Sequence, residues 1–303
     1  MKIIQVKDNT YCIDVDSAYI PLYKLNEKDI VLLDTGSPSQ RDLIQSALDE
    51  NKFNVVGIIN SHSHPDHVGN NKYFKEKYNC LIAMPMYEAG MCSSLLNLKA
   101  SHSNMTLTEL EEQYGFMIFE TDEYITSKQE EINFCGVNFK IMHTPGHSPS
   151  HICIITPDDV GYMGDALISY ELIDSIKIPF GFVLSEDLKC KDNLISLECS
   201  RYIVAHKGIY DDITNLIADN IRFYISRAES ILDVIQGKMT MGEITKAALK
   251  NFRVAVNNMY KYELLFRMVG VYVDYLYETG RVRLVLDKDL RKYEKNEDNK
   301  LAV

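Results

Sequence analysis

The chain has 303 residues, 46% of them hydrophobic and 25% charged, which is the composition of a soluble globular protein and argues against disorder. Its formal net charge of −11 disfavours general binding to nucleic-acid backbones. The seven cysteines are scattered and include no Cys-x-x-Cys pair, so we expect reduced thiols and no disulfide framework. Without an apolar leader or a run of about 20 apolar residues, we expect a cytoplasmic protein with no membrane contact.

The first 60 residues contain short apolar runs separated by turn residues, a pattern that is typical of β-strands. Strands are expected at 3–6, 11–15, 18–22, 30–33 and 55–59, with a helix at 40–49. A helix is expected from His67 to about Tyr78. Further strands are expected at 80–83, 137–143, 151–156, 161–163 and 202–205. Strands that alternate with helices indicate a layered α/β domain.

Two segments depart from this pattern. Residues 84–131 form a Met-rich stretch that we interpret either as a lid or binding element or as a plain helical insertion. After Gly208 the apolar residues follow helical spacing, and helices are expected at 210–235, 241–250 and 257–278. We therefore divide the chain into an α/β domain at 1–209 and a mainly helical domain at 210–303.

The run Ser61-His62-Ser63-His64-Pro65-Asp66-His67 lies between the strand at 55–59 and the following helix. On an extended chain His62, His64 and Asp66 project to one side, while His67 turns away as the helix begins. Imidazole and carboxylate ligands suit zinc, iron or manganese, and two groups of ligands suit two metal ions. A solvated polar turn is the alternative, which the spacing and the strand-to-helix context argue against.

Three further candidates each follow a predicted strand. They are His147 in Pro145-Gly146-His147, Asp165 in Met163-Gly164-Asp165, and His206 in Ala205-His206-Lys207. Residues at the ends of several strands can converge on one edge of a sheet. The remaining histidines, His102, His143 and His151, are not expected to bind metal.

In type and order, these seven candidate ligands match the dinuclear ligand set of the metallo-β-lactamase superfamily, which residues 1–209 resemble. The resemblance implies an αββα sandwich with two divalent metal ions at one edge, zinc being favoured and iron or manganese the alternatives. One ion would bind His62, His64 and His147, the other Asp66, His67 and His206, with Asp165 bridging them. Asp34 matches a position that supports the motif loop from behind the ligands.

For this ligand set the resemblance implies hydrolysis by a metal-bridged hydroxide, with Asp66 orienting it and taking its proton. Secreted β-lactamases of the superfamily commonly have Cys at the position of Asp165, and flavin-linked diiron members usually have Glu at the position of His64. The expected substrate is a small ester, thioester or lactone. An RNA phosphodiesterase and a mononuclear-iron persulfide dioxygenase are the alternatives.

The tail is similar to that of the lactamase-like endoribonucleases and unlike the glutathione-binding tail of glyoxalase II. Two helices followed by the apolar run at 280–286 resemble a winged helix. Its basic residues could bind phosphates, although a solvated helical face is the favoured interpretation; they are Arg253, Lys261, Arg267, Arg281 and Arg283. The apolar content of 264–276 predicts packing against the α/β domain or against a second copy in a homo-oligomer.

Overall fold

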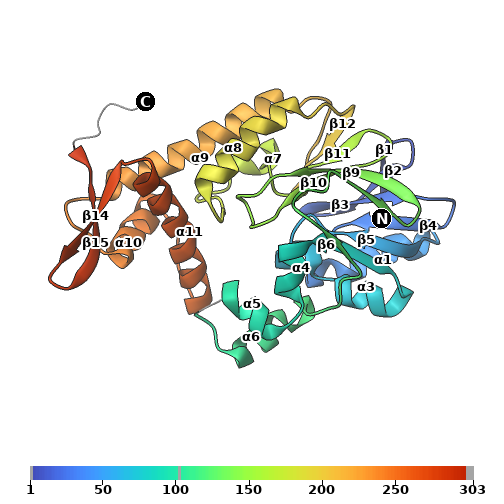
Figure 1. Ribbon diagram of the computed structural model, residues 1–303, viewed down its shortest axis with the longest axis horizontal. Helices are drawn as coiled ribbons and strands as arrows, with labels where there is room; N and C mark the ends of the chain where they lie inside the picture. Colours follow the sequence, from blue (N-terminus) through green and yellow to red (C-terminus); the bar gives the residue numbers. More distant parts are fainter. Residues whose placement is uncertain (1–2, 102–103, 298–303) are drawn as a thin grey trace.

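The computed structural model describes residues 3–101 and 104–297, and its main body contains two stacked β-sheets (Figure 1). The first sheet has the strand order β1-β2-β3-β4-β5-β6-β7 and the second the order β13-β12-β11-β10-β9-β8. The strands of the first sheet are Ile3–Lys7, Thr10–Val15, Ala18–Lys24, Asp29–Leu33, Asn54–Ile59, Leu81–Pro85 and Glu123–Ile125. Those of the second, from β8 to β13, are Glu131–Phe134, Val137–His143, Ile152–Ile155, Val160–Tyr162, Arg201–Ile203 and Ile209–Tyr210.

Strand β4 shows how the apolar pattern creates the layers. Ile30 and Leu32 face the helical side of the first sheet, whereas Val31 and Leu33 lie in the core between the two sheets. Successive side chains of a strand point to opposite faces, so a run that is apolar at every position must be covered on both faces. All four of these side chains are fully buried.

Helices cover the outer face of each sheet. Helix α1 (Arg41–Glu50) and helix α3 (Asn71–Tyr78) pack on the first sheet. The first turns of α9 (Thr214–Val234) pack on the second sheet through Leu216 and Ile217. The arrangement is an αββα sandwich, which confirms the expected fold class.

Residues 84–131 form a helical insertion that contains α4 (Met86–Cys92), α5 (Leu95–Ser101) and α6 (Leu107–Tyr114). Buried side chains of all three helices extend the apolar core under the first sheet. His102 lies outside the described residues.

The tail continues from α9 with α10 (Met241–Asn251), α11 (Met259–Glu278) and a hairpin of β14 (Val282–Asp287) and β15 (Leu290–Lys295). It has its own apolar core, to which α9, α10 and α11 all contribute. Because α9 reaches both this core and the second sheet, the domain boundary at 209/210 stays a prediction. The winged-helix assignment also stays a prediction.

The insertion and the tail touch each other beside the sandwich (Figure 1). The hydroxyl of Tyr114 on α6 donates a hydrogen bond of 2.7 Å to the hydroxyl of Tyr260 on α11. On the same helix, the Arg267 guanidinium donates a bond of 2.8 Å to the carbonyl oxygen of Ser101.

The single helix expected from His67 to Tyr78 is wrong. The chain forms α2 (Pro65–Val68) and then restarts as α3. The His67 carbonyl accepts hydrogen bonds from both the backbone N–H and the hydroxyl of Thr35, and the Asn70 side chain donates to the Thr35 and Ser37 carbonyls. These bonds to the loop after β4 replace the bonds that a continuous helix needs.

Several elements were not predicted from the sequence: α7 (Tyr170–Ile173), α8 (Leu184–Asn193), β7, β8, β13 and β15. Helix α8, with the sequence LSEDLKCKDN, has too few apolar residues to form a helical stripe.

No helix in the described part of the chain is long and apolar enough to cross a membrane.

Candidate metal centre

The candidate ligands come from the carboxyl ends of five strands. Asp34 follows β4 and the motif follows β5, and these two strands are parallel. His147 follows β9, Asp165 follows β11 and His206 follows β12. Strands β11 and β12 are parallel, and β9 runs in the same direction because β10 is antiparallel to both β9 and β11. All five ends therefore meet at one edge of the sandwich.

The first group of ligand atoms consists of three imidazole nitrogens. His64 Nδ1 lies 2.8 Å from His62 Nε2 and 3.1 Å from His147 Nε2. An Asp165 oxygen lies 3.3 Å from the same His147 nitrogen. These four residues form one cluster in which every offered ligand atom lies within 4.8 Å of the others.

The tautomer of His62 follows from its neighbour. The Ser61 hydroxyl donates to Asp34 at 2.6 Å, so it can only accept from His62 Nδ1, which lies 2.9 Å away. With its proton on Nδ1, His62 presents the lone pair of Nε2 to the cluster.

The second group consists of Asp66, His67 and His206. His206 Nε2 lies 3.3 Å from an Asp66 oxygen and 3.4 Å from an Asp165 oxygen, and His67 Nε2 lies 3.2 Å from that same Asp165 oxygen. The Asp165 carboxylate thus directs one oxygen to each group.

The expectation that Asp66 projects to the same side as His62 and His64 is wrong. Asp66 lies in helix α2, for which His64 is the N-cap and Pro65 the first residue. Because the extended chain ends at His64, the alternation of faces stops there and Asp66 joins His67 instead.

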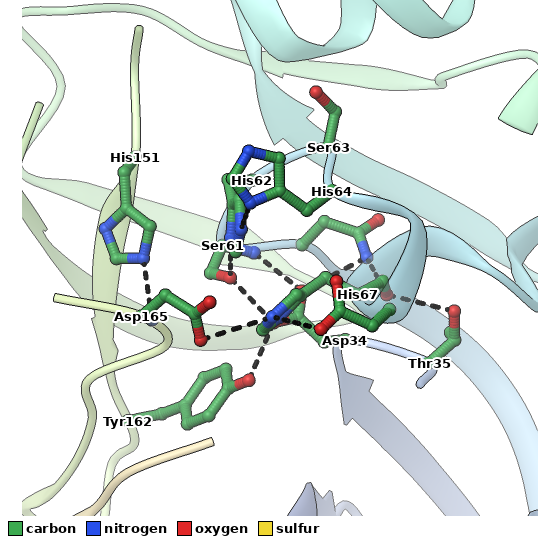
Figure 2. A network of polar contacts seen from close by, with 12 residues as sticks. Asp34, Thr35, Ser61, His62, Ser63, His64, His67, His151, Tyr162 and Asp165 are labelled. Carbon is green, nitrogen blue, oxygen red and sulfur yellow. Dashed lines mark hydrogen bonds and ion pairs between the residues drawn. The ribbon is translucent and has the colours of Figure 1, made fainter. Parts of the chain in front are cut away.

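Asp34 supports both groups from behind (Figure 2). It is buried and has a left-handed backbone with φ 63°. One carboxylate oxygen accepts from the Ser61 hydroxyl, from His67 Nδ1 at 2.8 Å and from the Tyr162 hydroxyl at 2.7 Å. Because Asp34 binds Nδ1, a neutral His67 would present the lone pair of Nε2 on the side of Asp165. Tyr162, which is fully buried on β11, was not identified from the sequence.

The two groups differ in electrostatics. Burial, together with neighbouring imidazoles, holds the pKa of His62 well below its ordinary value, and burial likewise lowers the pKa of His147. The Asp165 carboxylate outweighs burial at His206 and raises its pKa to about 10. For Asp66 burial raises the pKa, but His67 and His206 outweigh burial and leave the pKa below its ordinary value. The carboxylates beside the second group thus favour positive charge on its imidazoles, which is the charge that a bound cation would supply.

The side chains fit a metal centre. Within the described ranges, two buried atoms that face the cluster lack a hydrogen-bond partner: His67 Nε2 and Asp165 Oδ1. Buried polar atoms are rarely left unpaired. Neutral imidazoles with lone pairs converging within 3.1 Å also repel one another unless a cation lies between them. Imidazole and carboxylate donors in this number are those that zinc and related divalent ions bind.

The sequence profile of the metallo-β-lactamase superfamily matches residues 14–206, from β2 to the last candidate ligand. The chain belongs to the metallo-β-lactamase superfamily. This confirms the family that the motif indicated. Members of this superfamily typically bind divalent metal ions, and the chain is a hydrolase of this fold.

Individual proteins that resemble the chain in sequence or in fold agree with its place in this superfamily. It is 27% identical over 192 residues to hydroxyacylglutathione hydrolase GloC of Haemophilus influenzae, covering 62% of this chain and 84% of that protein. A metallo-β-lactamase family protein of Thermus thermophilus superposes with a TM-score of 0.70 at 17% identity and covers 95% of this chain and 99% of its own. A β-lactamase domain protein of Burkholderia ambifaria gives a TM-score of 0.71 at 16% identity, covering 97% and 94%. The shared fold therefore includes the tail.

The other two described histidines of the chain have different contacts. His151 uses both ring nitrogens, because Nδ1 bonds to the Thr144 hydroxyl at 2.8 Å and Nε2 accepts from the Asp165 backbone N–H at 3.1 Å. His143 bonds to the carbonyl oxygen of Gln129. A Cβ at Gly164 would lie 2.6 Å from the His151 ring, so the turn before Asp165 requires a residue without a side chain.

One apolar side chain lies against the first group. The Phe180 ring lies 4.8 Å from the His64 ring and 5.5 Å from the His147 ring, measured between centroids. The Tyr224 hydroxyl on α9 donates to the Phe180 carbonyl oxygen at 3.1 Å. The tail thus helps to hold an aromatic side chain beside the candidate metal centre, and no sequence pattern indicated Phe180.

Proposed function

We propose that the protein is a hydrolase that binds two divalent metal ions, with zinc as the favoured metal. His62, His64 and His147 would hold one ion and Asp66, His67 and His206 the other, with Asp165 between them. The observation that carries this proposal is the position of the Asp165 carboxylate, within 3.4 Å of His67, His147 and His206. A carboxylate shared by two complete ligand groups suits a dinuclear centre.

When bound, two such ions would acidify water to give a nucleophile at neutral pH and would polarise the substrate. Asp66 is the most exposed of the carboxylates at the site, and we assign it the role of proton acceptor. His206 contacts Asp66 and holds its carboxylate in place. Asp34 and Ser61 keep the His67 and His62 rings in the tautomers that present Nε2 to the site.

We further propose a small ester, thioester or lactone as substrate. Several relatives carry the name hydroxyacylglutathione hydrolase, which supports cleavage of an acyl group. The Phe180 ring beside His64 offers an apolar surface for the acyl part of such a substrate.

The alternatives receive less support. Of the five basic residues that could bind an RNA backbone, Arg281 pairs with Glu229 through two bonds, Arg283 pairs with Glu294, and Arg267 donates to Ser101. A single-iron dioxygenase would need only the first ligand group, whereas the second group is equally well formed.

The test combines metal analysis of the purified protein with a hydrolysis panel of thioesters, lactones, phosphodiesters and β-lactams. We expect about two equivalents of metal per chain and turnover of an acyl substrate that is insensitive to added salt. Phosphodiester cleavage with a steep loss of activity in salt would support RNA processing. One iron per chain without hydrolysis would support the dioxygenase.

A cytoplasmic location and a homo-oligomer formed through the tail also remain proposals. Apolar side chains exposed on the hairpin of the tail, Leu286 at 79% and Leu290 at 52%, support an interface there. Light scattering after gel filtration measures the molar mass, and a monomer at high concentration would contradict the oligomer.

A further inference from the structure

A second buried carboxylate lies behind the candidate metal centre, and it comes from the insertion. Glu88 on α4 is fully buried. No lysine, arginine or histidine among the described residues forms an ion pair with it. A buried carboxylate without a cation must be stabilised by hydrogen-bond donors.

The donors to Glu88 come from both loops that carry the first ligand group. Oε2 accepts from the Ser63 hydroxyl at 2.5 Å and from the Ser63 backbone N–H at 3.2 Å. Oε1 accepts from the Ser148 hydroxyl at 2.7 Å and from the Ser150 backbone N–H at 2.9 Å. Ser63 lies between His62 and His64, and Ser148 directly follows His147.

We propose that Glu88 is a positioning residue that fixes the two loops of the first ligand group relative to each other. The loops belong to different sheets, and Glu88 spans them with one oxygen for each. It thereby sets the separation of His64 from His147, whose nitrogens lie 3.1 Å apart. Glu88 thus adds, for the first group alone, to the support that Asp34 gives to both groups. This inference rests on the proposed metal binding.

The substitution Glu88→Gln tests the proposal because it keeps the shape of the side chain. Each oxygen accepts from one serine hydroxyl and one backbone N–H. A hydroxyl can turn to accept from the amide NH₂ of glutamine, but a backbone N–H cannot, so on the side of the NH₂ the N–H of Ser63 or Ser150 loses its partner and that loop is held less firmly. Cys92→Ala is the matched control: Cys92 is fully buried on the same helix, and it contacts neither loop through a hydrogen bond among the described residues.

The measurements are the affinity for Zn²⁺, by competition with a chromophoric chelator, and the visible spectrum of the Co²⁺-loaded protein. We expect Glu88→Gln to weaken the binding of at least one equivalent about 10- to 100-fold and to change the Co²⁺ spectrum. Cys92→Ala should bind Zn²⁺ with wild-type affinity, even if Cys92→Ala and Glu88→Gln lower the melting temperature by the same amount.

If Glu88→Gln does not fold, Ser148→Ala takes its place. This substitution removes one of the hydrogen bonds to Glu88 and should also weaken Zn²⁺ binding, but by a smaller factor. The proposal would be overturned if Glu88→Gln bound Zn²⁺ with wild-type affinity and gave an unchanged Co²⁺ spectrum. The same result in Ser148→Ala would overturn it if that variant has to be used instead. So would an equal loss of affinity in Cys92→Ala. If the wild-type protein itself binds no metal, the proposed function fails first.

Discussion

At the scale of single residues, the site contains two kinds of side chain. Some offer a candidate ligand atom to a metal ion, and others hold these ligands in their orientation through hydrogen bonds. His62 and His67 each have one nitrogen held by a hydrogen bond, and the other nitrogen is directed into the site. Hydrogen bonds of this kind fix the tautomer of a metal ligand and raise its basicity. In the proposed metal centre, the chemistry would therefore depend on Ser61 and Asp34 as well as on the imidazoles.

Asp66 is the residue for which the proposed function makes the sharpest prediction. Asp66→Asn removes the carboxylate charge while keeping the size of the side chain, so we expect kcat to fall by about 10²- to 10⁴-fold. The measurement is turnover on the substrate that the hydrolysis panel identifies. Glu76→Gln, an exposed carboxylate on α3, is the control and should retain activity. Wild-type turnover in Asp66→Asn would contradict the role assigned to it.

The cysteines give a prediction about pH. Burial raises the pKa of Cys135, Cys190 and Cys199 to about 11. The pKa of a cysteine in the unfolded chain is about 8.5. Between about pH 8.5 and about pH 11 the native protein therefore binds more protons than the unfolded chain does. The free energy of unfolding should therefore fall as pH rises from about 8.5 to about 11.

Alkylation by iodoacetamide checks the same shift. The native protein should react at a rate that still increases at pH 10, whereas the urea-unfolded protein should reach its plateau near pH 9.5. A common plateau for the two states would show that these thiols are not perturbed.

At the scale of elements, helix α8 determines where the His147 loop lies. The Gly146 carbonyl accepts from the Phe182 and Val183 N–H groups just before α8 begins. A Cβ on Gly146 would lie 2.2 Å from the backbone nitrogen of Asp187 in α8, and the residue has φ +124°. Glycine is therefore required both by the contact and by the backbone conformation.

We accordingly expect Gly146→Ala to cost about 2 to 4 kcal/mol of stability and to displace His147. Urea unfolding measures the first effect and Zn²⁺ affinity the second. Gly270→Ala in the middle of α11 is the control, because a Cβ there meets nothing within 4 Å. It should stabilise the protein by about 0.5 to 1 kcal/mol. Equal behaviour of the two variants would refute the steric account.

Helix α10 provides a prediction confined to the tail. Its N-cap Thr240 accepts from the Glu243 N–H, and the Glu243 carboxylate accepts from the Thr240 N–H. Thr240→Ala should destabilise the protein by about 1 kcal/mol, whereas Thr240→Ser keeps the capping hydroxyl and should have nearly wild-type stability. Since the cap is remote from the ligands, kcat should not change. A fall in kcat would mean that the helix is coupled to the reaction.

The sequence indicated some elements well and others poorly, for physical reasons. Strands β4 and β5 are apolar at nearly every position because both faces are covered, and the motif after β5 is dense in ligand types. Helix α8 has no apolar stripe, since its contacts are a buried Asp187–Lys191 pair and close backbone packing at Gly146. Glu88 and Tyr162 could not be foreseen, because a single acid or tyrosine has no pattern until the chain has folded around it.

At the scale of the whole molecule, the proposed metal binding should be linked to folding. The candidate ligands come from both sheets, so a bound ion connects segments that are far apart in sequence and binds the native state only. Metal at about 100 times its dissociation constant should add about 2.7 kcal/mol to stability. Removal by a chelator should lower the melting temperature by about 5 to 10 °C, and added Zn²⁺ should reverse the change. His62→Ala should lack most of this response; an identical response would place the metal elsewhere.

The contact of α6 with α11 has a consequence for engineering. Tyr114 and Tyr260 form a hydroxyl pair, although they belong to segments 146 residues apart. In a chimera that takes its tail from another member of the superfamily, the Tyr114 hydroxyl would face a tail surface that lacks the Tyr260 hydroxyl. The insertion and the tail should therefore be transplanted together, as one exchangeable module.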